Sequence, residues 1–194
     1  MKAMHAYARE HSGITKEESE ECDRCPVSIY SRLGSATMSK VSHQFYNRVY
    51  ADELWFRKVF SASTREEAIA NQRDFLIERF GGPKVYSERK GGRLRLMGRH
   101  APYDLNPKTA QRWLEHMEAA LDDVKEVDDQ TKGEMMQYFK HTAHLLVASK
   151  SFTNCTHLID YHNRMSMTNG GEKAEVVGGL QAAETEEVGG AAAI

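Results

Sequence analysis

Gly98-Arg99-His100-Ala101-Pro102-Tyr103, followed by a helix that carries Trp113, is the stretch that decides how this chain folds. It joins a basic, glycine-rich loop to a clear helix start, because Asn106-Pro107 supplies an N-cap residue and a first-turn proline. A histidine on a short, restrained turn is a candidate metal ligand, and the large ring on the next helix could wall a bound group. Since such a histidine is more often an ordinary loop residue, its neighbours must decide between the two interpretations.

Periodic apolar residues around this stretch predict helices, and no segment alternates convincingly like a strand. The predicted helices are 37–51, with a stripe from Met38 to Val49; a second opened by a capping box at Ser63 or Thr64 and running to Phe80; a third after Asn106-Pro107; and a last one opened by Asp128 or Asp129. The sequence therefore predicts an all-α fold.

Composition divides the chain into three parts. Lys and Arg number 26 against 28 Asp and Glu, a formal net charge of −2, which argues against nucleic-acid binding by the whole chain. There is no apolar run of the roughly 18 residues that a membrane span needs, and three cysteines suit a reducing compartment. We expect a cytoplasmic protein with a loosely ordered N-terminal arm (1–25), a central domain (26–151) and a flexible tail (152–194) rich in Gly, Ala and Glu.

Two polar residues lie where an enclosed pocket would need them. Tyr46 is one residue past the apolar stripe of its helix, and Ala68, Gln72 and Phe75 share one face of the next long helix. An apolar pocket that requires a few hydrogen-bond donors would use these residue types. The plain alternative is that Tyr46 and Gln72 are half-exposed residues at helix boundaries.

The segment between Gly82 and His100 is broken by glycines and strongly basic. It could surround a doubly charged anionic ligand, form a solvated surface loop, or bind nucleic acid. The absence of an aromatic ladder weakens the last alternative. Its basic residues are Lys84, Arg89, Lys90, Arg93, Arg95 and Arg99.

Taken in order, these motifs resemble a known family. The residues that carry the resemblance are Phe45-Tyr46-Asn47-Arg48-Val49, Phe60, Phe75-Leu76, Phe80-Gly81-Gly82-Pro83, Tyr86-Ser87-Glu88-Arg89, Arg99-His100-Ala101-Pro102-Tyr103 and Arg112-Trp113-Leu114-Glu115-His116-Met117. Residues 28–150 are similar to a truncated, two-over-two haemoglobin of group II, the plant type with terminal extensions. The resemblance implies two helix pairs crossed over a haem b, with the helix before His100 reduced to a loop and a turn.

The resemblance also implies a role for each matching residue. His100 would be the proximal ligand of the haem iron, while Tyr46, Gln72 and Trp113 would be the hydrogen-bond donors on the distal side. Ala68 stands where many globins have a distal histidine, which implies five-coordinate ferrous iron. The remaining haem contacts would be the pocket walls Phe60, Phe75 and Trp113, and the propionate partners Tyr86, Arg89 and Arg99.

The function that the resemblance implies is reversible binding, and possible transport, of O2 and other diatomic gases by a monomer or weak homodimer. One alternative is a haem redox enzyme that acts on nitric oxide or peroxide and takes electrons from an external reductase. Another is a haem-free helical interaction module that uses the tails. Separately, Cys22 and Cys25 could form a redox switch, or a zinc site with Cys155 and His157, against the plain interpretation of reduced thiols.

Overall fold

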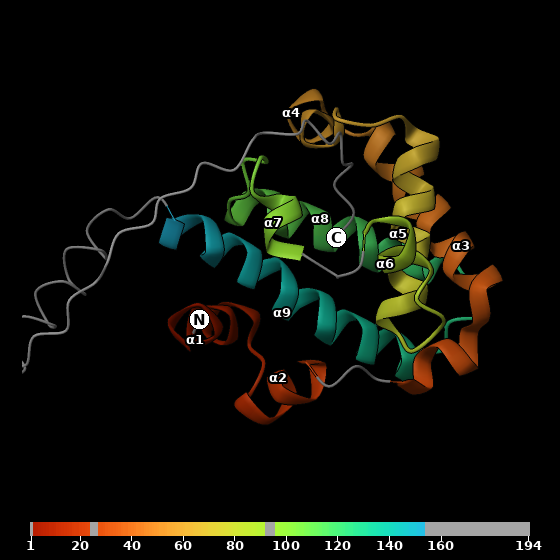
Figure 1. Ribbon diagram of the computed structural model, residues 1–194, viewed down its shortest axis with the longest axis horizontal. Helices are drawn as coiled ribbons and strands as arrows, with labels where there is room; N and C mark the ends of the chain where they lie inside the picture. Colours follow the sequence, from red (N-terminus) through yellow and green to blue (C-terminus); the bar gives the residue numbers. More distant parts are fainter. Residues whose placement is uncertain (1, 24–26, 92–95, 154–194) are drawn as a thin grey trace, which may run out of the picture.

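The computed structural model describes residues 2–23, 27–91 and 96–153, and every regular element in these ranges is a helix (Figure 1). In chain order they are α1 (Lys2–Ser12), α2 (Lys16–Asp23), α3 (Val27–Ala51), α4 (Leu54–Arg57), the 3-10 helix η1 (Lys58–Phe60), α5 (Arg65–Arg79), α6 (Val85–Arg89), α7 (Leu96–His100), α8 (Pro107–Asp122) and α9 (Asp129–Thr153). The predicted all-α fold is confirmed. None of the described helices is both long and apolar enough to cross a membrane. The tail predicted over 152–194 lies outside the described residues from residue 154 onward.

Four long helices form the core in two crossed pairs. Helix α3 packs against α5 and α8, and α8 packs against α9. Figure 1 shows α3 and α5 side by side, running across the direction of α8 and α9. Aromatic rings join the pairs, because Trp113 of α8 lies between Phe45 of α3 and Phe139 of α9, with ring centroids 5.1 and 5.3 Å away. This arrangement is the predicted two-over-two fold.

Side-chain caps fix the beginnings of three core helices. Of the two possible capping boxes, the chain uses the one in which Thr64 and Glu67 exchange hydrogen bonds with each other's backbone N–H groups. Asn106 accepts a hydrogen bond from the backbone N–H three residues on, as predicted, at 3.1 Å. Asp128 does the same for α9 at 2.7 Å, so Asp128 is the cap and Asp129 the first helical residue.

Glycines determine the backbone path near the start of α3 and just after the end of α5. Helix α3 begins ten residues before the predicted start at 37, and it bends at Gly34, whose φ of 68° favours glycine. At the end of α5, the N–H of Gly82 donates to the carbonyl of Ile77 at 2.8 Å. A Cβ on Gly82 would lie 2.7 Å from that oxygen and 2.9 Å from the ring of Tyr30, so only glycine allows this close approach.

Residues 2–23, which the composition predicts to be loosely ordered, instead form α1 and α2, and both pack against α9. Ala8 of α1 has no exposed surface. The rings of His5 and His11 on α1 lie 5.6 and 6.1 Å from those of His141 and His144 on α9. Histidine rings make part of this contact, and they leave no apolar pattern in the sequence.

Candidate functional site

His100 is the last residue of the short helix α7, where the sequence predicts a short, restrained turn. Its side chain is buried, and Nδ1–H donates to the carbonyl of Leu96 at 2.7 Å. Nε2 is also buried and has no hydrogen-bond partner among the described residues. Because burial lowers the pKa of His100, the ring stays neutral, with a free Nε2 lone pair at a fixed orientation. A neutral imidazole held through its other nitrogen is the form that binds a metal ion.

His100 borders an apolar cavity between α7, η1, α8 and α9. The other lining residues are Val59, Phe60, Leu105, Thr109, Ala110, Trp113, Ala143, Leu146 and Val147. Three residues that the resemblance assigns to one pocket, Phe60, His100 and Trp113, therefore do meet at one cavity. A cavity with apolar walls and a single available ring nitrogen suits a flat, apolar group that carries a metal ion.

The three predicted donor residues are buried on three different helices, and one of them, Trp113, lines this cavity. Tyr46 on α3 has no exposed surface, and its ring centroid is 5.9 Å from that of Phe60. Gln72 on α5 is also fully buried, so the half-exposed interpretation of Tyr46 and Gln72 is wrong. Burial raises the pKa of Tyr46 far above its usual range, and its hydroxyl therefore remains a donor.

Several of the polar atoms are unsatisfied. Neither amide atom of Gln72 has a hydrogen-bond partner within the described part of the chain, and the same is true of the Trp113 indole Nε1. A buried polar atom without a partner costs about 1–3 kcal/mol, so folded proteins keep few of them. Ala68, one turn before Gln72, is buried and offers no polar group. Within the described part of the chain, these polar groups therefore remain available to a bound ligand.

A cationic rim lies beside this region. The Arg99 guanidinium stacks over the ring of Tyr86 at 5.3 Å, and the Tyr86 ring in turn lies 5.7 Å from that of Phe75. Arg99 also donates to the carbonyl of Lys90 at 3.1 Å. The pKa of Lys90 is lowered, first by burial and then by the charges of Arg89 and Arg99. An anionic group would relieve this mutual repulsion.

Arg89, the third predicted propionate partner, is engaged elsewhere. Its guanidinium donates to the carboxylate of Asp74 at 2.6 and 3.0 Å and to the side-chain oxygen of Asn71 at 2.8 Å. These contacts tie α6 to α5 and direct the charge of Arg89 toward Asp74. Arg99 is therefore the arginine of the pair that is better placed for an anionic edge of a ligand.

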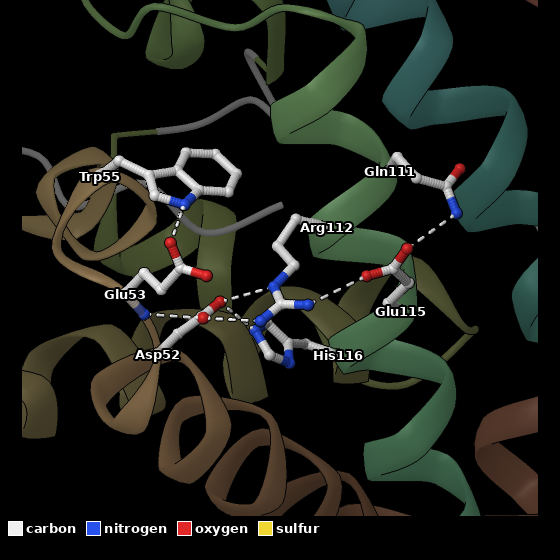
Figure 2. A network of polar contacts seen from close by, with 7 residues as sticks. All are labelled: Asp52, Glu53, Trp55, Gln111, Arg112, Glu115 and His116. Atoms are coloured by element: carbon white, nitrogen blue, oxygen red, sulfur yellow. Dashed lines mark hydrogen bonds and ion pairs between the residues drawn. The ribbon is translucent and has the colours of Figure 1, made fainter.

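Sequence reasoning missed a buried ion cluster, which Figure 2 shows. The side chain of Asp52, just after α3, is 3% exposed. Its two oxygens accept hydrogen bonds from Arg112 of α8 at 2.7 and 2.8 Å, and His116 Nε2 lies 2.6 Å from one of them (Figure 2). Arg112 and His116 are one turn apart on one helix face, a visible signal, but nothing in the sequence names the acid that would face them.

The fold and the cavity together define a class: a helical protein that encloses a flat, metal-bearing prosthetic group bound by one histidine. Comparison with known proteins makes this specific. The Bacterial-like globin family model matches residues 28–145. Over 155 residues the chain is 42% identical to Two-on-two hemoglobin-3 of Arabidopsis thaliana, which covers 79% of this chain and 87% of the relative. It is 37% identical to Group 2 truncated hemoglobin 3-1 of Lotus japonicus, over 79% of this chain and 90% of that relative.

A solved structure agrees with these relatives. The hemoglobin of Chloroflexus aurantiacus superposes with a TM-score of 0.55 at 41% identity, covering 59% of this chain and 93% of that one. The chain belongs to the bacterial-like globins, and within them to the group II truncated haemoglobins of plant type. It is therefore a haem-binding globin, and the available Nε2 of His100, the apolar walls and the cationic rim all fit that cofactor.

The two cysteine hypotheses fall largely outside the described part of the chain. Cys25, Cys155 and His157 lie in the segments that the structure does not describe, while Cys22 lies within α2. Both hypotheses therefore stay predictions.

Proposed function

We propose that this globin binds O2 reversibly and releases it slowly, with His100 as the ligand of the iron. Bound haem supplies an open coordination position for a diatomic gas and shifts negative charge onto the gas. Tyr46, Gln72 and Trp113 would then donate hydrogen bonds to that charge, and each charge-assisted bond contributes on the order of 1.5–3 kcal/mol. Each such bond corresponds to a roughly tenfold to hundredfold slower release.

One observation carries this proposal: fully buried polar atoms on α5 and α8 have no partner among the described residues. A haem pocket devoted to electron transfer has no use for donors on the gas side, whereas a pocket that retains a polarised gas requires them. The protonated hydroxyl of Tyr46 adds a third donor from α3.

Ala68 supports the same function because it lacks a group that could bind the iron. Its methyl group cannot bind iron, so we propose that the ferrous protein is mainly five-coordinate and open to an incoming gas. A six-coordinate ferrous spectrum without added ligand would contradict this.

The test is the absorbance of purified, haem-reconstituted protein with and without CO, followed by stopped-flow measurement of O2 release. Trp113→Phe and Tyr46→Phe should each release O2 faster, because each removes one donor while keeping an aromatic ring. Trp55→Phe is the matched control, since the Trp55 indole donates to Glu53 at 3.0 Å and does not line the cavity. Unchanged rates in both variants would remove these donors from the proposed function. Steady consumption of nitric oxide with an added reductase would favour the redox alternative instead.

A further inference from the structure

The donors proposed to surround the gas belong to helices that are distant in sequence. Tyr46 lies on α3 and Trp113 on α8, so their separation depends on how these two helices are placed against each other. A hydrogen bond weakens steeply when its angle or length departs from the optimum, which makes this placement critical. Something must therefore fix α3 against α8 near the pocket.

The ion cluster of Asp52, Arg112 and His116 joins these same two helices. Asp52 follows Tyr46 by six residues, about 9 Å along a helix, and Arg112 is the residue directly before Trp113. The guanidinium of Arg112 meets both oxygens of Asp52 in a two-point contact, which restricts rotation as well as separation (Figure 2). The backbone N–H of Glu53 also donates to Asp52, at 2.7 Å, and holds the carboxylate in its turn.

Aromatic contacts extend the cluster to the cavity wall. The ring of His116 lies 5.4 Å from that of Phe56 on α4, and Phe56 lies 5.3 Å from Phe60. Phe60 lines the cavity and packs edge-on against Tyr46. Through His116, Phe56 and Phe60, the cluster is therefore in contact with the cavity wall against which Tyr46 packs.

We propose that Asp52, acting through Arg112 and His116, is the positioning residue that fixes α3 against α8 and thereby sets the geometry of the Tyr46 and Trp113 donors. This inference rests on the proposed O2-binding function for its consequence in gas release. The placement of the two helices itself can be tested without haem.

Asp52→Asn tests the proposal, because it keeps the shape of the side chain and removes the charge that holds Arg112. We expect O2 release from the reconstituted variant to accelerate roughly threefold to tenfold, a fraction of the effect of losing a whole donor. The C–O stretching frequency of the ferrous CO complex should shift, since it reports donors near the bound gas. Glu115→Gln is the matched control: it removes a more exposed partner of Arg112, 3.3 Å away, and should change neither quantity.

A second measurement uses the apoprotein. The chain has two tryptophans, so Trp55→Phe leaves Trp113 as the only source of tryptophan emission. Adding Asp52→Asn to this background should shift the emission of Trp113 to longer wavelength, because its helix is no longer held against α3. If Asp52→Asn is too unstable to purify, Arg112→Lys keeps the charge but loses the two-point contact, and it should produce smaller shifts of the same sign.

Loss of stability alone, with an unchanged CO stretch and unchanged Trp113 emission, would overturn the proposal and leave Asp52 as a purely structural residue. The proposed function fails separately, if the wild-type protein takes up haem but binds no O2 or releases it as fast as Tyr46→Phe. In that case the apoprotein fluorescence still decides whether Asp52 positions the helices.

Discussion

Replacing Gln72 with methionine should change stability and gas binding in opposite directions. Gln72 is fully buried, and both its amide nitrogen and its amide oxygen lack a partner among the described residues. Methionine has a similar length and flexibility and no group to satisfy. Removing the unsatisfied amide should stabilise the apoprotein by about 1–3 kcal/mol. For a chain of this size this corresponds to a rise in Tm of roughly 2–12 °C.

The same substitution removes a proposed donor to the bound gas. With that bond contributing on the order of 1.5–3 kcal/mol, O2 release should become roughly ten to a hundred times faster. Urea unfolding of the apoprotein measures the first effect, and stopped-flow displacement of O2 by CO measures the second. Gln111→Met is the control, because Gln111 is exposed on α8 and donates to Glu115 on the same helix. Destabilised apoprotein combined with an unchanged release rate would refute the reasoning on both counts.

Three further predictions follow from single contacts. His100→Gly should lose the Soret band of bound haem and regain it with added imidazole; a band that persists without imidazole would mean that another residue binds the iron. Thr64→Ala should lower the free energy of unfolding by about 1 kcal/mol, measured in urea, whereas Ser63→Ala, outside the capping box, should be nearly neutral. The pKa of His144 is lowered by burial and then by His11, so its stabilising contribution is present above about pH 6.5 and lost as the pH falls through the lowered pKa. His144→Gln should therefore flatten the acid side of the stability profile, and an unchanged profile would show that another group is responsible.

The core of the fold could be predicted because its signals are local. A capping box, an Asn-Pro pair and a Gly-Gly-Pro stop each act within a few residues, and the structure uses all three. The docking of α1 and α2 could not be predicted, because it depends on contacts between residues more than 100 positions apart. An example is Ser19, whose hydroxyl lies 3.2 Å from Nε2 of His141. Polar and ring-bearing side chains that meet across such a distance leave no periodic apolar pattern.

The residues of the site likewise include some that could be predicted from the sequence and some that could not. His100 could be identified as a candidate ligand from the motif around it, and the structure adds a local hydrogen bond from its Nδ1–H to the carbonyl of Leu96. The burial of Tyr46 and Gln72 is different, because each lies at the edge of a helical stripe and its exposure is decided by the helix packed against it. Asp52 gave no signal at all, since an acid at the end of a helix is usually solvated.

The buried polar groups of this globin are therefore of two kinds, and substitutions should change the stability of the fold in opposite directions for the two. Gln72 and the indole of Trp113 lack partners among the described residues, so the folded apoprotein carries a cost that a bound ligand can offset. Asp52, by contrast, is hydrogen-bonded to other groups of the protein. These hydrogen bonds hold the pKa of its carboxyl below the usual range; the largest effect comes from Arg112, and smaller ones come from His116 and the Glu53 N–H. Removing a group of the first kind should strengthen the fold while weakening gas retention, whereas neutralising Asp52 should weaken both. Under the proposed function, a pocket whose donors come from separate helices needs both the unsatisfied donors and the ion cluster. The donors can hold a gas only if the helices that carry them keep their positions relative to each other.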